Sequence, residues 1–140
     1  MIYIGSDHAG FRLKEKIKEY LSEKNIEFED CGCYNEESCD YPDIAKTTCK
    51  KISSEEEKAI LVCGTGVGMS ITANKIHGIR AVCAHDSFSI KHSRLHNNAN
   101  VFCVGARVVG FGLALELLEI FLATHFEGGR HQKRISKIED

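Results

Sequence analysis

The residues best suited to chemistry form one short glycine-rich segment. It reads Cys63-Gly64-Thr65-Gly66-Val67-Gly68-Met69-Ser70 and follows an apolar run. Glycines at alternate positions let successive backbone N–H groups turn toward one point, and the N-terminus of a following helix adds partial positive charge. The segment therefore predicts an anion-binding loop.

Two better-known phosphate loops do not fit this segment. A Walker A loop needs Gly-Lys-Ser/Thr, which is absent, and a dinucleotide fingerprint needs a third glycine where Met69 stands. A tight turn, whose glycines serve only close packing, remains an alternative.

Cys63 enters the loop from the end of the apolar run. The thiolate is the reactive form of cysteine, and a helix N-terminus favours it. We therefore expect Cys63 to be a base or a nucleophile. The alternative is a buried core thiol, which is our interpretation of Cys49, Cys83 and Cys103.

Neither group of candidate metal ligands has a recognised spacing. Cys31 and Cys33 are followed by a single further cysteine, Cys39, which is not a zinc spacing, so we interpret all three as surface thiols. His92 and His96 lie four apart but lack the glutamate of His-Glu-x-x-His. We expect no metal and no cofactor.

Three residues outside the loop suit proton transfer or phosphate binding. His96 lies at the end of a predicted helix, where a histidine can exchange protons near neutral pH; a C-cap role is the alternative. Arg130 and Arg134 would share a face if the tail is helical, and guanidinium groups suit phosphate oxygens. A solvated basic face is the alternative for this pair.

Length and charge narrow the class of protein. The 140 residues predict a single domain, with a basic tail from about residue 128. Eighteen Lys and Arg against 20 Asp and Glu give a net charge of −2, so we expect neither nucleic acid nor membrane as partner. Seven cysteines, an odd number, and a strand-like start without an export signal favour a reduced cytoplasmic protein.

The candidate residues above have to be positioned by strands and helices, which the sequence also predicts. Five runs predict strands: Ile2–Gly5, Glu27–Cys31, Ala59–Cys63, Arg80–Ala84 and Val101–Val104. Helical segments lie between and after them: a stripe of Leu13, Ile17, Tyr20 and Leu21, a segment after Tyr41-Pro42, one beginning near Gly68, Ser87–Leu95 and Gly110–Thr124.

Alternation of strands and helices predicts a doubly wound, Rossmann-like αβα sandwich with a five-stranded parallel sheet. Right-handed crossovers bring the carboxyl ends of the strands to one edge, where such folds bind ligands. We expect the site at that edge.

Six segments together resemble the type-B sugar-phosphate isomerase family, the group of ribose-5-phosphate isomerase B and the galactose-6-phosphate isomerase subunits. They are Gly-Ser-Asp-His-Ala-Gly at 5–10, Asp-Tyr-Pro-Asp at 40–43, the loop at 63–70, His-Asn-Asn-Ala-Asn at 96–100, Gly-Ala-Arg at 105–107 and Gly-Gly-Arg-His-Gln-Lys-Arg at 128–134. The resemblance covers almost the whole chain.

The resemblance implies interconversion of ribose 5-phosphate and ribulose 5-phosphate through a cis-enediolate, without metal or organic cofactor. Cys63 matches the family's base, which some members replace by a glutamate. His96 matches the residue that protonates the ring oxygen, with Asp7 as its partner in that step. Thr65 matches a group that steadies the enediolate.

The resemblance also implies a substrate-binding set and a homodimer, or a tetramer, whose sites combine residues of two subunits. The set comprises His8, Tyr41, Gly64, Gly66, Val67, Gly68, Ser70, Asn97, Arg107, Arg130 and Arg134. Of these, His8 and the three arginines match the phosphate side. His96, Asn97, Arg107 and the tail arginines are the residues that would act across the interface.

Two alternatives remain open at this point. An isomerase of six-carbon sugar phosphates, such as allose 6-phosphate or galactose 6-phosphate, would carry the same motifs with a deeper pocket. A phosphate-binding domain without a reaction would use the loop but need neither Cys63 nor His96. A redox role of the thiols is disfavoured because no Cys-x-x-Cys is present.

Overall fold

The computed structural model describes residues 1–139, and its elements confirm the predicted α/β architecture. The strands are β1 (Ile2–Ser6), β2 (Phe28–Asp30), β3 (Lys58–Cys63), β4 (Ala81–Cys83) and β5 (Val101–Gly105). The helices are α1 (Phe11–Glu23), α2 (Tyr41–Cys49), α3 (Val67–Ala73), α4 (Ser87–Leu95), α5 (Phe111–Ala123) and α6 (Arg130–Ile135). Within the described residues no helix is long and apolar enough to cross a membrane.

The five strands form one parallel sheet in the order β2-β1-β3-β5-β4. Because β2 and β3 lie on opposite sides of β1, the order reverses beside β1, which creates the switch point where such sheets bind ligands. The register pairs Ser6 with Val62 and Cys63 with Gly105. The carboxyl ends of β1, β3 and β5 therefore lie next to one another.

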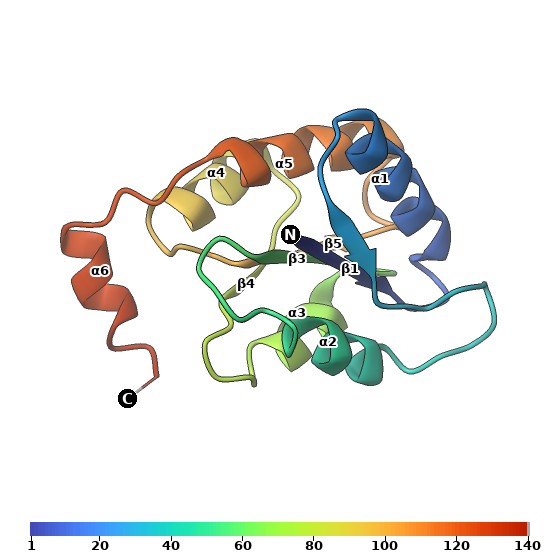
Figure 1. Ribbon diagram of the computed structural model, residues 1–140, viewed down its shortest axis with the longest axis horizontal. Helices are drawn as coiled ribbons and strands as arrows, with labels where there is room; N and C mark the ends of the chain where they lie inside the picture. The colour runs from blue at the N-terminus through green and yellow to red at the C-terminus, as the bar shows by residue number, and fades with distance from the viewer. Residues whose placement is uncertain (140) are drawn as a thin grey trace.

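Helices cover both faces of the sheet, with α1, α4 and α5 on one side and α2 and α3 on the other (Figure 1). In α1, Leu13, Ile17 and Leu21 recur every four residues and are buried against the sheet, as the sequence pattern predicts. On the opposite face, Met69 and Ala73 of α3 are fully buried. Each face of the sheet therefore has its own apolar core.

The segment after β2 is more buried than the sequence predicts. Cys31 and Cys33, interpreted as surface thiols, are each 8% exposed, so that interpretation is wrong for both. The reason is that the backbone continues alongside β1 beyond the end of β2: the Cys31 N–H donates to the Ile4 carbonyl and the Cys33 N–H to the Ser6 carbonyl, both at 2.7 Å.

A fully buried lysine ties the same segment to α1. The Lys14 ammonium donates to the Asp30 carboxylate at 2.7 Å and to the Cys33 carbonyl. Burial raises the pKa of Asp30, but hydrogen bonds from Lys14, Lys18 and the Gly32 N–H outweigh it, so that pKa lies below its usual range.

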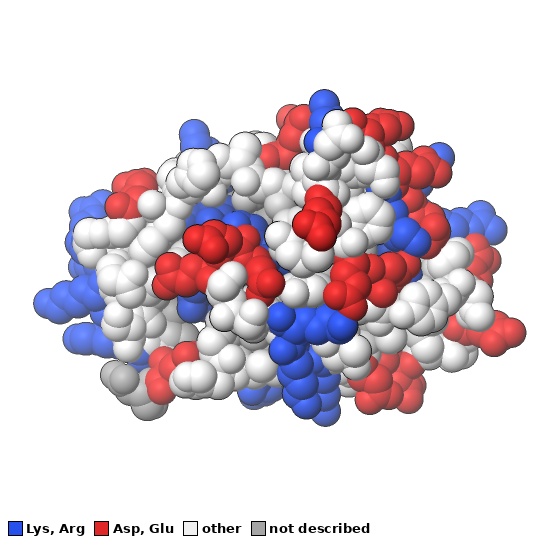
Figure 2. Space-filling model, viewed as in Figure 1, with Lys and Arg blue, Asp and Glu red and all other residues white. Residues whose placement is uncertain are grey.

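The basic tail forms α6, which stands apart from the sheet (Figure 1). It begins after Gly128 and Gly129, whose φ angles of +70° and +56° make the sharp turn that glycine permits. None of its residues is buried. Figure 2 shows Lys and Arg side chains gathered over this end of the molecule.

Candidate active site

A cleft of about 450 Å³ opens at the carboxyl edge of the sheet, at the predicted position. Its lining residues are Asp7, Tyr41, Cys63, Gly64, Thr65, Val67, Gly68, Ile71 and Arg107. The cleft therefore collects the segments after β1, β3 and β5 together with the starts of α2 and α3. Ile71, one turn into α3, is the lining residue that the sequence motifs did not indicate.

The glycine loop places one backbone N–H donor on the Cys63 sulfur. Gly66 has a φ of +81° and its N–H donates to the Cys63 sulfur at 3.1 Å. The sulfur lies at the end of β3, and the residue is 5% exposed. A backbone N–H aimed at a sulfur supports negative charge on it. The loop therefore holds the Cys63 sulfur at the floor of the cleft with a backbone donor aimed at it.

The end of β5 supports the loop from the neighbouring strand. The Ala106 N–H donates to the Cys63 carbonyl at 2.9 Å, and the Arg107 N–H donates to the Gly64 carbonyl at 3.0 Å. The Arg107 guanidinium lies close over Gly64, where it adds positive charge to the rim of the cleft. Gly105, the last residue of β5, is buried directly under the loop.

Gly105→Ala is expected to reduce turnover at least tenfold, because an added Cβ would lie 2.7 Å from the backbone carbonyl of Thr65 and push the loop away. The same overpacking should cost about 1–3 kcal/mol of unfolding free energy. Initial rates and thermal unfolding measure the two effects. Gly112→Ala is the matched control, since a Cβ there on α5 meets no atom within 4 Å. Normal turnover of Gly105→Ala would show that the loop position is not critical.

Residues after β1 and at the start of α2 complete the cleft. Asp7 is 7% exposed, and its carboxylate accepts the Gly10 N–H at 3.1 Å. The Tyr41 ring packs on Gly68 so closely that a Cβ there would lie 2.7 Å from the ring. His8 is exposed at the same edge, where its Nδ1 accepts the Cys39 N–H at 3.3 Å.

Ser70 and Gly66 extend the loop into α3. The Ser70 N–H donates to the Gly66 carbonyl at 3.1 Å, which makes the first helical turn. The helix therefore begins inside the glycine segment, and its N-terminus faces the cleft as the sequence predicts.

The structure does not bring His96 to this cleft within one chain. His96 is the C-cap of α4, which starts after β4 at the carboxyl edge and ends shortly before β5 begins at Val101. His96 therefore lies at the amino edge, and the length of β5, about 13 Å, separates the two edges. Asn97 follows it directly, and Arg130 and Arg134 lie on α6 beside it.

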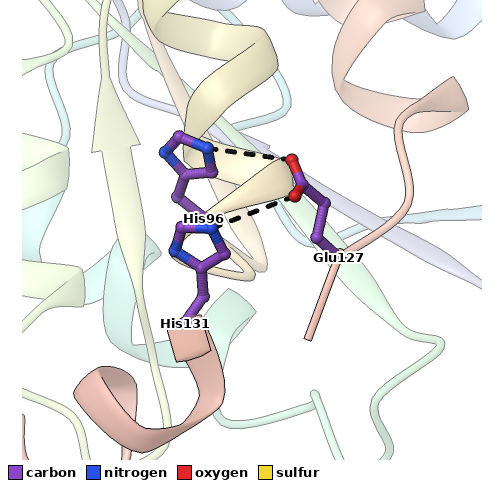
Figure 3. Close-up of side chains that lie close together, drawn as sticks. All are labelled: His96, Glu127 and His131. Carbon is purple, nitrogen blue, oxygen red and sulfur yellow. Dashed lines mark ion pairs between the residues drawn. The ribbon is translucent and has the colours of Figure 1, made fainter. Parts of the chain in front are cut away.

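Around His96 the structure forms a second cluster, with Glu127 and His131 (Figure 3). The Glu127 carboxylate lies 3.7 Å from His96 Nε2 and 3.9 Å from His131 Nε2. Burial and the positive charges of His96 and Arg130 lower the pKa of His131. Two imidazoles and a carboxylate are also zinc ligands, but the adjacent arginines oppose a cation and suit an anion.

Comparison with known proteins identifies the family of this chain. Residues 2–138 match the family described as ribose/galactose isomerase. The chain belongs to this family. A putative sugar phosphate isomerase of Bacillus subtilis is 50% identical over 141 residues, covering 99% of this chain and 95% of its own.

Solved structures of the family superimpose closely on this chain. Ribose 5-phosphate isomerase B of Thermotoga maritima has a TM-score of 0.94 at 51% identity, covering 98% of this chain and 95% of its own. The Mycoplasma genitalium ribose-5-phosphate isomerase B, solved with bound ribulose-5-phosphate, has a TM-score of 0.91 at 39% identity, with 98% and 92% covered. The family resemblance seen in the six sequence segments is thereby confirmed.

Proposed function

We propose that this chain, acting as one isomerase domain over residues 1–140, interconverts ribose 5-phosphate and ribulose 5-phosphate. The observation that carries the proposal is the Cys63 sulfur at the floor of the cleft, inside a loop of backbone N–H donors. The full-length similarity to ribose-5-phosphate isomerase B proteins supports the choice of substrate. A cytoplasmic location, expected from the odd number of thiols, belongs to the same proposal.

The reaction follows from the position of Cys63. Its thiolate removes the proton from C2 of the open-chain aldose, the electron pair moves toward the C1 carbonyl, and a cis-enediolate forms. The same proton then returns to C1 while the proton of the C2 hydroxyl passes to the C1 oxygen, so that C2 becomes the carbonyl carbon and the ketose results. Positioned proton transfer of this kind contributes about 10²–10⁴-fold. Neither a metal ion nor an organic cofactor is needed in this scheme.

The developing oxyanion sets the second requirement of the site. Preorganised N–H donors at such an oxygen are worth about 3 kcal/mol each, and the amides of Gly64–Gly68 can supply them. Thr65 and Asn97 would steady the same intermediate. The remaining substrate contacts of the proposal are His8, Arg107, Arg130 and Arg134 on the phosphate, and Tyr41 and Ser70 in the cleft.

Ring opening has to precede proton transfer because the aldose is mainly cyclic. In the proposal, His96 protonates the ring oxygen while Asp7 takes the proton of the anomeric hydroxyl. Asp7 lies in the cleft of its own chain, whereas His96 lies at the amino edge. Both residues can meet one substrate only if two copies of the chain share a site.

We therefore propose a homodimer whose sites are shared between the two chains. In the alternative assembly, a tetramer, two such dimers associate. The α4 helix supports the homodimer, since it runs from the carboxyl edge to the amino edge of the sheet. Two α4 helices packed antiparallel about a twofold axis would bring His96 of one copy to the carboxyl edge of the other. Phe88, at the opposite end of α4 from His96, is 70% exposed and offers apolar surface for that contact.

The substrate is tested by incubating the protein with ribose 5-phosphate, allose 6-phosphate or galactose 6-phosphate in the presence of a chelator, and following ketose formation. We expect ribose 5-phosphate to be isomerised with the highest kcat/KM. A higher value for a six-carbon sugar would move the proposal to that substrate. If no ketose forms from any of the three sugars, the chain is a phosphate-binding domain without a reaction. If ketose forms without the chelator but not with it, the metal-free scheme is contradicted.

A further inference from the structure

Glu127 lies beside His96 but has no role in the proposed reaction as described above. Its carboxylate lies between the Nε2 atoms of His96 and His131, and the two rings stack with centroids 4.1 Å apart and planes 13° apart (Figure 3). The second ring nitrogen of His96 points away from Glu127 (Figure 3). One face of the imidazole and one of its nitrogens are thus engaged, while the other nitrogen makes no hydrogen bond to the described residues.

The backbone holds Glu127 at this place from both sides. Its N–H donates at 3.1 Å to the carbonyl of Leu95, the residue immediately before His96. The Gly128-Gly129 turn follows directly and returns the chain so that His131 covers the His96 ring. The backbone of Glu127 is therefore tied to the end of α4, which keeps its half-exposed side chain beside His96.

The other groups around His96 do not compete for this role. His92, one turn earlier on α4, meets the His96 ring edge-on with centroids 4.9 Å apart. Burial together with His96 and Arg130 lowers the pKa of His131, which disfavours its charged form. The Glu127 carboxylate also lies slightly closer to His96 Nε2, at 3.7 Å, than to His131 Nε2, at 3.9 Å. The arginines of α6 carry positive charge and cannot orient an imidazole N–H.

We propose that Glu127 is a positioning residue for His96: its carboxylate, 3.7 Å from Nε2, favours a proton on that nitrogen, so that Nδ1 carries the proton delivered to the sugar ring oxygen. This inference rests on the proposed function, in which His96 opens the ring. The Nδ1 proton moves to the ring oxygen, the bond from C1 to that oxygen breaks with its electron pair on oxygen, and Asp7 takes the anomeric hydroxyl proton. His96 is left neutral with its remaining proton on Nε2, facing Glu127.

The test compares Glu127→Gln with wild type on two aldoses. Ribose 5-phosphate has to be opened, whereas erythrose 4-phosphate cannot close a furanose ring because its terminal hydroxyl is phosphorylated. We expect kcat on ribose 5-phosphate to fall about fivefold, as for a partly exposed ion pair, and turnover of erythrose 4-phosphate to stay unchanged. Glu127→Asp should recover part of the loss. Glu116→Gln, at an exposed position of α5, is the matched control.

Imidazole ¹⁵N NMR gives a readout that a merely structural role would not move. We expect His96 of the wild type to keep its Nε2–H, and Glu127→Gln to lose that preference. Equal losses on both aldoses, or an unchanged NMR signature with unchanged rates, would overturn the inference. A wild-type protein that isomerises neither sugar would instead overturn the proposed function, so the two failures are distinguishable.

Discussion

Replacement of Cys63 by alanine is expected to lower isomerisation of ribose 5-phosphate by about 10³-fold or more while substrate binding persists. The thiol is the base that carries the proton between C1 and C2, and loss of a positioned base costs about 10²–10⁴-fold. Binding should survive because the phosphate contacts come from other residues, among them Arg107 at the rim of the cleft.

Ketose formation measures the first half of this prediction, and calorimetric titration with the substrate measures the second. Cys83→Ala is the matched control, since the Cys83 thiol on β4 contacts the same loop, 3.7 Å from the Thr65 carbonyl, without lining the cleft. Turnover of the control should stay within a few-fold of wild type. Near-normal turnover of Cys63→Ala would remove the thiol from the mechanism.

His96→Ala is expected to show a loss that depends on whether the substrate is cyclic. Turnover of ribose 5-phosphate should fall about 100-fold, because protonation of the ring oxygen loses its acid. Erythrose 4-phosphate needs no ring opening and should be isomerised at close to the wild-type rate. Initial rates on both sugars give the ratio directly.

His92→Ala controls for disturbance of α4, because His92 lies on the same face one turn earlier and contacts the His96 ring. Its two rates should change together and only slightly. If His96→Ala lowers both rates by the same factor, His96 has a role other than ring opening.

The fold and the cleft could be predicted from local patterns in the sequence. Apolar runs located β1, β3, β4 and β5, whereas the run that predicted β2 is the least apolar of the five. The spacing of Leu13, Ile17 and Leu21 predicted the buried face of α1. Because the carboxyl ends of parallel strands meet at one edge of the sheet, the sequence alone assigns the segment after Cys63 to the site. Local sequence was sufficient because each of these features depends on neighbouring residues.

Features that depend on contacts between distant segments could not be predicted in this way. The burial of Cys33 follows from pairing beside β1, and that pairing has no signal in the residues around it. The contact of Glu127 with His96 depends on the hydrogen bond from the Glu127 N–H to the Leu95 carbonyl, and the stacking of His131 on His96 depends on the turn at Gly128-Gly129. The order β2-β1-β3-β5-β4 likewise emerges only from the packed sheet.

The shared site is the central claim, and complementation between two inactive variants tests it most directly. Cys63→Ala and His96→Ala chains are co-expressed with different tags, and heterodimers carrying one chain of each kind are purified. If Cys63 of one copy works with His96 of the other, one of the two sites is intact, and we predict about half of the wild-type turnover of ribose 5-phosphate per dimer. If each chain held a complete site, both sites would be damaged, and heterodimers as inactive as the parent variants would contradict the account.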